Sequence, residues 1–498
     1  MHAIAHNIQH IIELMLRNLL MVVCCLLLLA GCQKSAAPTQ KIHFAIAQAP
    51  LNLDPRYATD AASERVNRLI YQPLVDFDTA SQPAWILARG DAVNEKNYRF
   101  ILQKSVNFHN GDALTAHDIK ATYDSLLKLK DSPHAAEFGN MESIKVLDEK
   151  TVIFTLKQGD THFISKLIIG ILPKSLIDKH HDFSRNPVGS GPLKFVSWQH
   201  DLKLTRVADS LQITLQEVKD PTVRVLKLKK GEIDLIQGDL PPELVKHLQT
   251  ISGIRVNTGL GANYSYLGLN MQNKLLKNLK VRQAIAHAID RQSIIDKVMV
   301  SNSRIAGAIL PPEHYTNANN SLPTYDYNPA LAQKLLIEAG VKLPLKLVYK
   351  TSTDAFRVRL ATIMQAQMAP AGIALEIKSL DWGTFFADVK AGNFQLYGLT
   401  WVGIKTPEIY SKTFGSTYFP PNGFNRGRYS DAELDKLLAE ENWPAATQRI
   451  HTQLPYTPLW YEGQFVAMQK NIKKYLPKPD GNWDDLTIIK RSATINKQ

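Results

Sequence analysis

The sequence has 498 residues, of which 45% are hydrophobic and 21% charged, proportions typical of a globular protein. The formal net charge is +12, but no block of five or more Lys or Arg residues occurs, which argues against a nucleic-acid-binding patch. The positive charge has two interpretations: a soluble surface beside anionic lipid, which we favour, and attraction of an acidic ligand.

An apolar segment near the N-terminus is typical of a signal peptide. Leu19–Ala30 carries no charge, and its length of about 12 residues is well below the roughly 20 that a membrane-spanning helix needs. Arg17 supplies the positive flank in front of it. The segment ends in Leu29-Ala30-Gly31-Cys32, which resembles the lipobox of bacterial lipoproteins. That resemblance implies that residues 1–31 are a signal peptide, and that a lipid on Cys32 anchors an exported, periplasmic protein to a membrane.

Cysteine usage agrees with this interpretation. The chain has three cysteines, Cys24, Cys25 and Cys32, so the body after Cys32 contains no disulfide and no thiolate metal ligand. Residues 1–14 are unusual ahead of a signal peptide, and we hypothesise that translation begins at Met15. A body of this length needs an ordinary hydrophobic core and is expected to divide into two or three lobes. The sequence leaves open whether the anchor lies in the inner or the outer membrane.

Along the body, segments with the pattern of strands alternate with segments with the pattern of helices. Asn110-Gly111 predicts a turn, and Thr115 with Asp118 predicts a capped helix start. Gly340 follows a predicted helix as a terminating residue would. The predicted strands are 42–46, 98–102, 151–156, 193–198, 233–236, 345–349 and 374–379, and the predicted helices are 61–69, 116–129, 223–231, 329–339 and 356–369. This alternation predicts an α/β fold.

An ordered set of motifs covers nearly the whole body, from about residue 42 to residue 490. The motifs are Tyr98–Asp118 (YRFILQKSVNFHNGDALTAHD), Gly189–Pro192 with Phe195, Gly231–Asp234, Val281–Arg291, Asn328–Gly340 and Leu454–Leu459. In this order they resemble the large extracytoplasmic solute-binding proteins of ABC importers, the family that holds dipeptide-, oligopeptide- and nickel-binding proteins. Most of these motif residues are expected to have structural roles.

The resemblance implies a two-lobed periplasmic-binding-protein-like (class II) fold with an extra inserted domain and a ligand cleft between the lobes. Its expected limits are 32–41 for the lipidated cysteine and linker, 42–70 with 186–270 and 480–495 for lobe I, 71–185 for the inserted domain, and 271–479 for lobe II. It also implies a monomer that captures a peptide or peptide-like solute and delivers it to ABC permease subunits in the cytoplasmic membrane.

The candidate ligand contacts lie around one tryptophan and one strand. Trp401 matches the tryptophan of a family stretch near the ligand, and Thr400, Val402 and Gly403 would offer backbone groups beside it. Tyr264 and Tyr266 have an apolar face and a polar tip, which suits a wet pocket, although a strand face in the core explains them equally well. Asn270 follows them and completes the set of candidates.

The sequence departs from the family's peptide binders at one position. In those proteins an acidic residue after the tryptophan pairs with the peptide's α-amino group, but Ile404 stands at that place and Lys405 follows. A buried ammonium needs a paired carboxylate. Glu408 would serve only if the loop is rearranged. The ligand is therefore a peptide held in another way, a blocked or modified peptide, or an anionic or metal-complex solute.

An enzyme has little support in the sequence. It contains no P-loop, no His-Glu-x-x-His and no Gly-x-Ser-x-Gly motif. His180-His181 is more typical of a solvated loop pair than of a metal site. We therefore expect no cofactor, no metal and no nucleic-acid partner, with an exported hydrolase as the remote alternative.

Overall fold

The computed structural model describes residues 41–129, 131–299, 302–316, 322–421 and 423–492, so the predicted signal peptide and Cys32 lie outside the described residues. Its largest element is a mixed sheet of eleven strands, ordered β15-β14-β16-β12-β17-β11-β1-β10-β9-β8, with β13 beside β17. A second sheet has the order β4-β5-β7-β6, and β2 with β3 and β18 with β19 form two small pairs. No helix among these residues is long and apolar enough to cross a membrane.

The strands of the large sheet are β1 (Lys41–Ile46), β8 (Leu193–Trp198), β9 (Leu202–Arg206), β10 (Gln212–Glu217), β11 (Leu235–Gln237), β12 (Ile254–Leu269), β13 (Arg304–Ile305), β14 (Leu345–Ser352), β15 (Ile373–Leu380), β16 (Leu396–Trp401) and β17 (Tyr456–Gln469). The other strands are β2 (Val75–Phe77), β3 (Pro83–Trp85), β4 (Ala88–Asn94), β5 (Asn97–Leu102), β6 (Met141–Val146), β7 (Thr151–Leu156), β18 (Ile472–Lys473) and β19 (Lys490–Arg491). β7 and β8 have the limits predicted from their alternating patterns.

The α-helices are α2 (Ala61–Ile70), α3 (Ala116–Lys128), α4 (Lys174–Ile177), α5 (Pro221–Lys230), α6 (Pro242–Gln249), α7 (Leu279–His287), α8 (Arg291–Val298), α9 (Pro329–Glu338), α10 (Ala355–Met368), α11 (Trp382–Ala391), α12 (Glu408–Phe414), α13 (Ala432–Ala439) and α14 (Trp443–Gln453). Short 3-10 helices are η1 (Ala135–Phe138), η2 (Ile164–Lys166), η3 (Ala369–Ala371) and η4 (Asp484–Thr487). The predicted start of α3 is confirmed, because Thr115 and Asp118 form a complete capping box.

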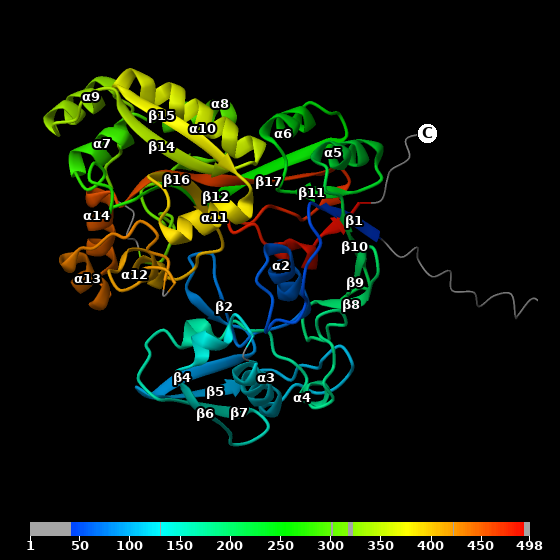
Figure 1. Ribbon diagram of the computed structural model, residues 1–498. Helices are drawn as coiled ribbons and strands as arrows, with labels where there is room; N and C mark the ends of the chain where they lie inside the picture. Colours follow the sequence, from blue (N-terminus) through cyan, green and yellow to red (C-terminus); the bar gives the residue numbers. More distant parts are fainter. Residues whose placement is uncertain (1–40, 130, 300–301, 317–321, 422, 493–498) are drawn as a thin grey trace, which may run out of the picture. The chain divides into compact units, whose positions relative to one another are not determined.

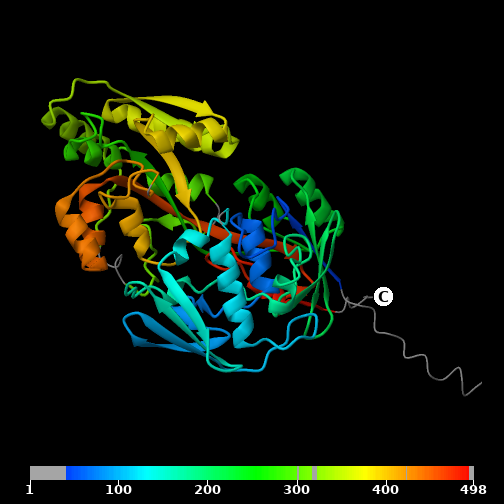
Figure 2. The same ribbon diagram turned by 60° about the horizontal axis from the view of Figure 1, so that its bottom comes forward.

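Buried side chains form four clusters. The α2 core joins β1 and α2 to β8, β9 and η4. The α3 core fills the space between α3 and the sheet β4–β7, which lie against each other in both views (Figures 1 and 2). The α5–α6 core packs those helices against β11 and β17. The α7–α14 core contains the helices from α7 to α14, with α10 packed along β14 and β15 (Figure 1).

Two long strands, β12 and β17, connect these cores. In β12, Ile254 belongs to the α5–α6 core, whereas Tyr264–Leu269 belong to the α7–α14 core. β17 runs antiparallel to β12 and contributes to three of the cores. Their register shifts between Gly259 and Asn263, where a side chain on Gly261 would collide with the backbone carbonyl of Glu462. The bulge therefore lies between the segments that serve different cores, and glycine is required in it.

The predicted helix 223–231 begins earlier than expected. Asp220 caps it by accepting a hydrogen bond from the backbone N–H of Val223, and Pro221 occupies its first turn. It ends as predicted at Gly231, whose φ of 74° is left-handed. The strand predicted at 233–236 begins instead at Leu235. Just ahead of it, the Asp234 carboxylate accepts a hydrogen bond from the backbone N–H of His43 and forms an ion pair with Arg491.

Arg282 is a buried cation that binds backbone rather than a carboxylate. Its guanidinium donates to the carbonyls of Leu276 and Lys277, ahead of α7, and to the carbonyl of Gln453, the last residue of α14. Burial lowers the pKa of Arg282. The motif Val281–Arg291 contains both Arg282 and Asp290. Asp290 caps α8 by accepting from Ser293 N–H, and Arg282 satisfies terminal carbonyls of α14.

We predict that Arg282→Met destabilises the protein by about 2 to 3 kcal/mol, because the buried carbonyl of Leu276 and the partly buried carbonyls of Lys277 and Gln453 lose their partner. Lys280→Met is the matched control on the same helix. It removes only the ion pair with Glu338, whose two side chains are 49% and 39% exposed, and should change stability by less than about 0.5 kcal/mol. Urea unfolding followed by circular dichroism measures both. Equal effects of the two substitutions would contradict this role of Arg282.

Candidate functional site

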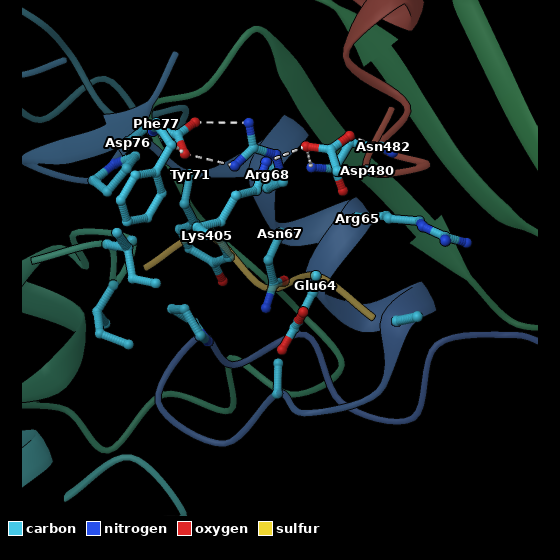
Figure 3. A pocket seen from close by; sticks show the side chains of 18 of the residues that line it. Glu64, Arg65, Asn67, Arg68, Tyr71, Asp76, Phe77, Lys405, Asp480 and Asn482 are labelled. Atoms are coloured by element: carbon cyan, nitrogen blue, oxygen red, sulfur yellow. Dashed lines mark hydrogen bonds and ion pairs between the residues drawn. The ribbon is translucent and has the colours of Figure 1, made fainter. Parts of the chain in front are cut away.

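A cavity of about 310 Å³ lies beside α2. One side of it comes from α2 and the residues before it, and the opposite side from the loop after β16, which contributes Val402, Gly403 and Lys405 (Figure 3). The lining also includes Pro73, Asp76 and Phe77 near β2, His134 and Glu137 at η1, residues 168–170, and Asp480 and Asn482. The cavity is therefore lined by residues from the α2 core, from the α3 core and from the loop that follows β16, a strand of the α7–α14 core.

Arg68 lies at one end of the cavity and is fully neutralised (Figure 3). Its guanidinium is 2.7 Å from the carboxylate of Asp76 and 3.2 Å from that of Asp484. Burial alone would lower the pKa of Arg68, but the hydrogen bonds to both carboxylates and their charges raise it. Since two anions already surround this cation, Arg68 offers little to an anionic ligand.

Lys405 is the second cation of the cavity, and it too has a partner. Its Nζ is 2.5 Å from Oδ2 of Asp480, and both side chains are largely buried. Burial would raise the pKa of Asp480, but the charge of Lys405 and its hydrogen bond hold that pKa below its ordinary value. The pair fastens the loop after β16 to the Asp480–Asn482 segment. Lys405, which the sequence suggested as a contact for an anionic ligand, is therefore already neutralised by Asp480.

Two side chains of α2 face the cavity with no partner among the described residues. Asn67 is only 7% exposed, yet neither Oδ1 nor Nδ2 has a hydrogen bond. The exposed side chain of Glu64 forms no ion pair or side-chain hydrogen bond with a described residue, and desolvation raises the pKa of its carboxyl group. Buried polar groups are normally satisfied, so an unpaired amide in a cavity wall indicates a missing partner.

Of the residues predicted from the sequence, Val402 and Gly403 line this cavity. Trp401 does not line it. Its indole lies 4.8 Å from the guanidinium of Arg426 and 5.5 Å from the ring of Phe424. Thr400 hydrogen-bonds to Ser265 at 2.7 Å and to Glu462 at 3.2 Å. Trp401 and Thr400 thus fix the end of β16, from which the cavity loop starts.

Tyr264, Tyr266 and Asn270 are buried away from the cavity. Tyr264 and Tyr266 belong to the α7–α14 core, where Tyr266 stacks on Tyr456 with ring centroids 4.1 Å apart. The Asn270 amide donates to the carbonyls of Gly392 and Phe394. The structure therefore places all three in packing or backbone-bracing positions, the core alternative that the sequence left open for the tyrosines.

Ile404 and Glu408, the two residues at issue for an amino-group anchor, both have other contacts. Ile404 packs against the α7–α14 core. Glu408 begins α12, and its carboxylate is 2.9 Å from Nδ1 of His162. The other ring nitrogen of His162 lies 2.9 Å from Glu441. Glu408 is therefore paired with His162, next to the α3 core, and does not line the cavity.

The His162 cluster has shifted pKa values. The hydrogen bond to Glu408 raises the pKa of His162 to about 9 against the opposing effect of burial. Burial would raise the pKa of Glu408, but hydrogen bonds from His162 and Thr406 bring it down to about 2. Protonated His162 between two carboxylates is thus a charged link between residues of the α3 core and the α12–α13 region.

Sequence reasoning missed Glu64, Asn67 and Arg68. Their spacing of three and four residues places them on one side of a helix, which the sequence does predict at 61–69. The same pattern describes any exposed helix face, so the cavity opposite α2 had no signal in the sequence. Among the described residues, no group of three or more His, Cys, Asp or Glu could hold a metal ion. His181 instead hydrogen-bonds to the carbonyl of Asn186.

Comparison with known proteins identifies the family. The chain belongs to the bacterial extracellular solute-binding proteins, family 5, whose model for the middle region matches residues 85–422. It is 26% identical to the oligopeptide-binding protein AppA of Bacillus subtilis, over 86% of this chain and 88% of that protein. It is 25% identical to di/tripeptide-binding protein 3 of Pseudomonas aeruginosa, over 86% and 91%.

The fold is that of solved members of the same group. NikA from Brucella suis, in complex with Fe(III)-EDTA, superposes with a TM-score of 0.81 at 21% identity, covering 91% of this chain and 100% of NikA. The predicted two-lobed periplasmic-binding-protein fold is therefore confirmed. Members of this family are substrate-binding proteins of transporters, not enzymes. The sequence-predicted domain limits and site residues stay predictions.

We predict a pH dependence for the His162 link. Its pKa is about 9 when folded against an ordinary 6.5, so its contribution is complete below pH 6.5 and is lost as pH rises through 9. Glu408 has the opposite sign: its contribution is present above pH 4.5 and is lost as pH falls towards 2. His162→Gln should therefore lower the thermal midpoint by about 2 °C at pH 6 and by less than about 0.5 °C at pH 10.

The control is His117→Gln, which removes an exposed histidine 3.7 Å from Glu149 and should leave the midpoint unchanged at both pH values. Differential scanning calorimetry measures the midpoints. An effect of His162→Gln that is equally large at pH 6 and pH 10 would show that the ring acts by packing rather than by charge.

Proposed function

We propose that this chain is the substrate-binding lipoprotein of an ABC importer, which captures a peptide or peptide-like solute in the cavity beside α2 and delivers it to a membrane permease. The observation that carries the proposal is the lining of that cavity. It contains unpartnered polar groups on α2 and, opposite them, the loop Val402–Lys405 from another core. A solute that contacts both sides biases the lobes towards the closed arrangement, which is how a binding protein signals occupancy to its permease.

Peptide is the first choice of solute for two reasons. Oligopeptide- and di/tripeptide-binding proteins are among the relatives that the chain matches along most of its length. The cavity also combines apolar walls, such as the half-exposed Ile168 and Val402, with amide and carboxylate groups, a mixture that suits a peptide backbone with varied side chains. The alternative is a non-peptide solute on the same scaffold, as in the Fe(III)-EDTA complex of NikA.

The candidate residues divide into two roles in this proposal. Val402 and Gly403 contact the solute from the loop after β16. Trp401 and Thr400 position that loop through Arg426 and Glu462. Tyr264, Tyr266 and Asn270 support the α7–α14 core from behind.

We predict that protein purified from its own cell envelope carries a trapped solute, visible by native mass spectrometry. Val402→Trp should reduce its occupancy and weaken its binding at least tenfold, about 1.4 kcal/mol, because the indole fills the cavity. Ile337→Trp is the control: Ile337 is exposed on α9 to a similar degree, 61% against 50% for Val402, and lies away from the cavity.

The mass of the trapped molecule decides between the alternatives. A peptide mass supports the proposal, and a non-peptide mass overturns the peptide assignment but leaves a solute-binding protein. Equal occupancy in Val402→Trp and Ile337→Trp would remove the cavity beside α2 from the function.

We further propose that Cys32 carries the lipid anchor on the extracytoplasmic side of the membrane. Cys32→Ala should abolish incorporation of labelled palmitate and release the protein from the membrane fraction, because the thiol is the only acceptor that the lipobox offers. Cys25→Ala, which changes the apolar segment but not the lipobox, should leave labelling intact. Labelled Cys32→Ala protein would exclude Cys32 as the anchor.

A further inference from the structure

The cavity-facing side of α2 presents two polar groups next to each other. Glu64 and Asn67 are three residues apart on the helix, which places their Cβ atoms about 5 to 6 Å apart. Figure 3 shows both side chains directed to the same side of α2, away from the ion pairs of Arg68 and Lys405. A carboxylate and an amide thus share one region of the cavity wall.

The charges around this region leave an excess of negative charge on Glu64. Arg68 is balanced by Asp76 and Asp484, and Lys405 by Asp480. Arg65 has its guanidinium 5.5 Å from the ring of Trp483 and points away from Glu64 (Figure 3). The charge of His134 lowers the pKa of Glu64, but His134 forms no ion pair with it and uses Nε2 in a hydrogen bond to the carbonyl of Ala58. No described cation is therefore paired with Glu64.

Asn67 provides the independent observation. Asn67 is more than nine-tenths buried and lines the cavity, yet neither Oδ1 nor Nδ2 of its side chain has a hydrogen-bond partner among the described residues. Leaving a buried amide unpaired costs free energy, so the position is unfavourable for folding alone. An amide both donates and accepts, which matches one peptide unit of a ligand.

We propose that Glu64 binds a primary ammonium group of the solute while Asn67 hydrogen-bonds to the amide next to it. This inference rests on the proposed function and names the solute class. The solute is a peptide or peptide-like molecule with a free amine, and residues of helix α2 bind that amine. The loop after β16 contributes Val402, Gly403 and Lys405 to the cavity, none of them acidic, so the carboxylate comes from the opposite wall.

An anion would be disfavoured at this place. It would meet the carboxylate of Glu64 without a free cation opposite, and its desolvation would be uncompensated. An ammonium would supply the ion-pair partner that Glu64 lacks among the described residues. Desolvation raises the pKa of Glu64, although the charges of His134, Arg65 and Arg68 act in the opposite direction. Glu142 is exposed on β6, outside the lining of the cavity, which makes it a matched control.

The test uses the whole mature chain and two probes: a pool of Ala-Xaa-Ala tripeptides with free amino groups and the same pool N-acetylated. Isothermal titration calorimetry should show that wild-type protein prefers the free-amino pool at least tenfold. Glu64→Gln should weaken binding of the free pool at least tenfold and leave the acetylated pool unchanged. Glu142→Gln should change both by less than twofold. Asn67→Ala should weaken both pools and leave the thermal midpoint unchanged, because the folded protein loses no hydrogen bond.

Each outcome is decisive. If the free pool binds wild type and Glu64→Gln equally, or if acetylation has no effect, the ammonium site is wrong and the proposed peptide-binding function stands. If neither pool binds wild-type protein, the peptide function itself fails, and this inference fails with it. Glu64→Gln keeps the shape of an exposed helical side chain, and a thermal midpoint within about 2 °C of wild type verifies that its fold is intact.

Discussion

The antiparallel pair β12–β17 is the constraint on which the rest of the molecule depends. The described residues contain four hydrophobic cores, and these two strands are the backbone that passes from the α5–α6 core to the α7–α14 core. Their register shifts at two places, Gly259–Asn263 and Ser265–Tyr266. The first shift interrupts the ladder between the segments that serve different cores, and the second lies within the segment that serves the α7–α14 core.

Charged pairs then set how the remaining surfaces meet. Lys405–Asp480 joins the loop after β16 to the segment that follows β17, and His162 joins the α3-core region to α12 through Glu408. Both pairs connect residues far apart in the sequence, and both are partly shielded from water, so they are stronger than exposed pairs. These pairs neutralise Lys405 and Glu408. The polar groups of α2 therefore remain as the unpaired groups that a solute in the cavity can contact.

The sequence predicted the fold well because local signals agreed with one another. The capping box at Thr115 and Asp118 and the alternating residues 151–156 each specify an element without tertiary information. The site was less predictable. Tyr264 and Tyr266 lie in a strand that is buried on both faces, where alternation no longer separates inside from outside. Glu64 has the pattern of a solvated helix position, and only the packing of distant segments places it in a cavity wall.

An ammonium site on α2 would divide the solute contacts between two cores. α2 belongs to the same core as β1 and η4, whereas the loop after β16 leaves a strand of the α7–α14 core. In the proposed arrangement, Glu64 and Asn67 hold the solute on the α2 side, and Val402 and Gly403 contact it from the loop. Contacts made to both sides at once would differ between open and closed arrangements, and such differential contacts are what shifts a conformational equilibrium. Ile404 packs against the α7–α14 core, so the acid that the loop after β16 lacks would be replaced from α2, and loss of contacts on either side would weaken binding.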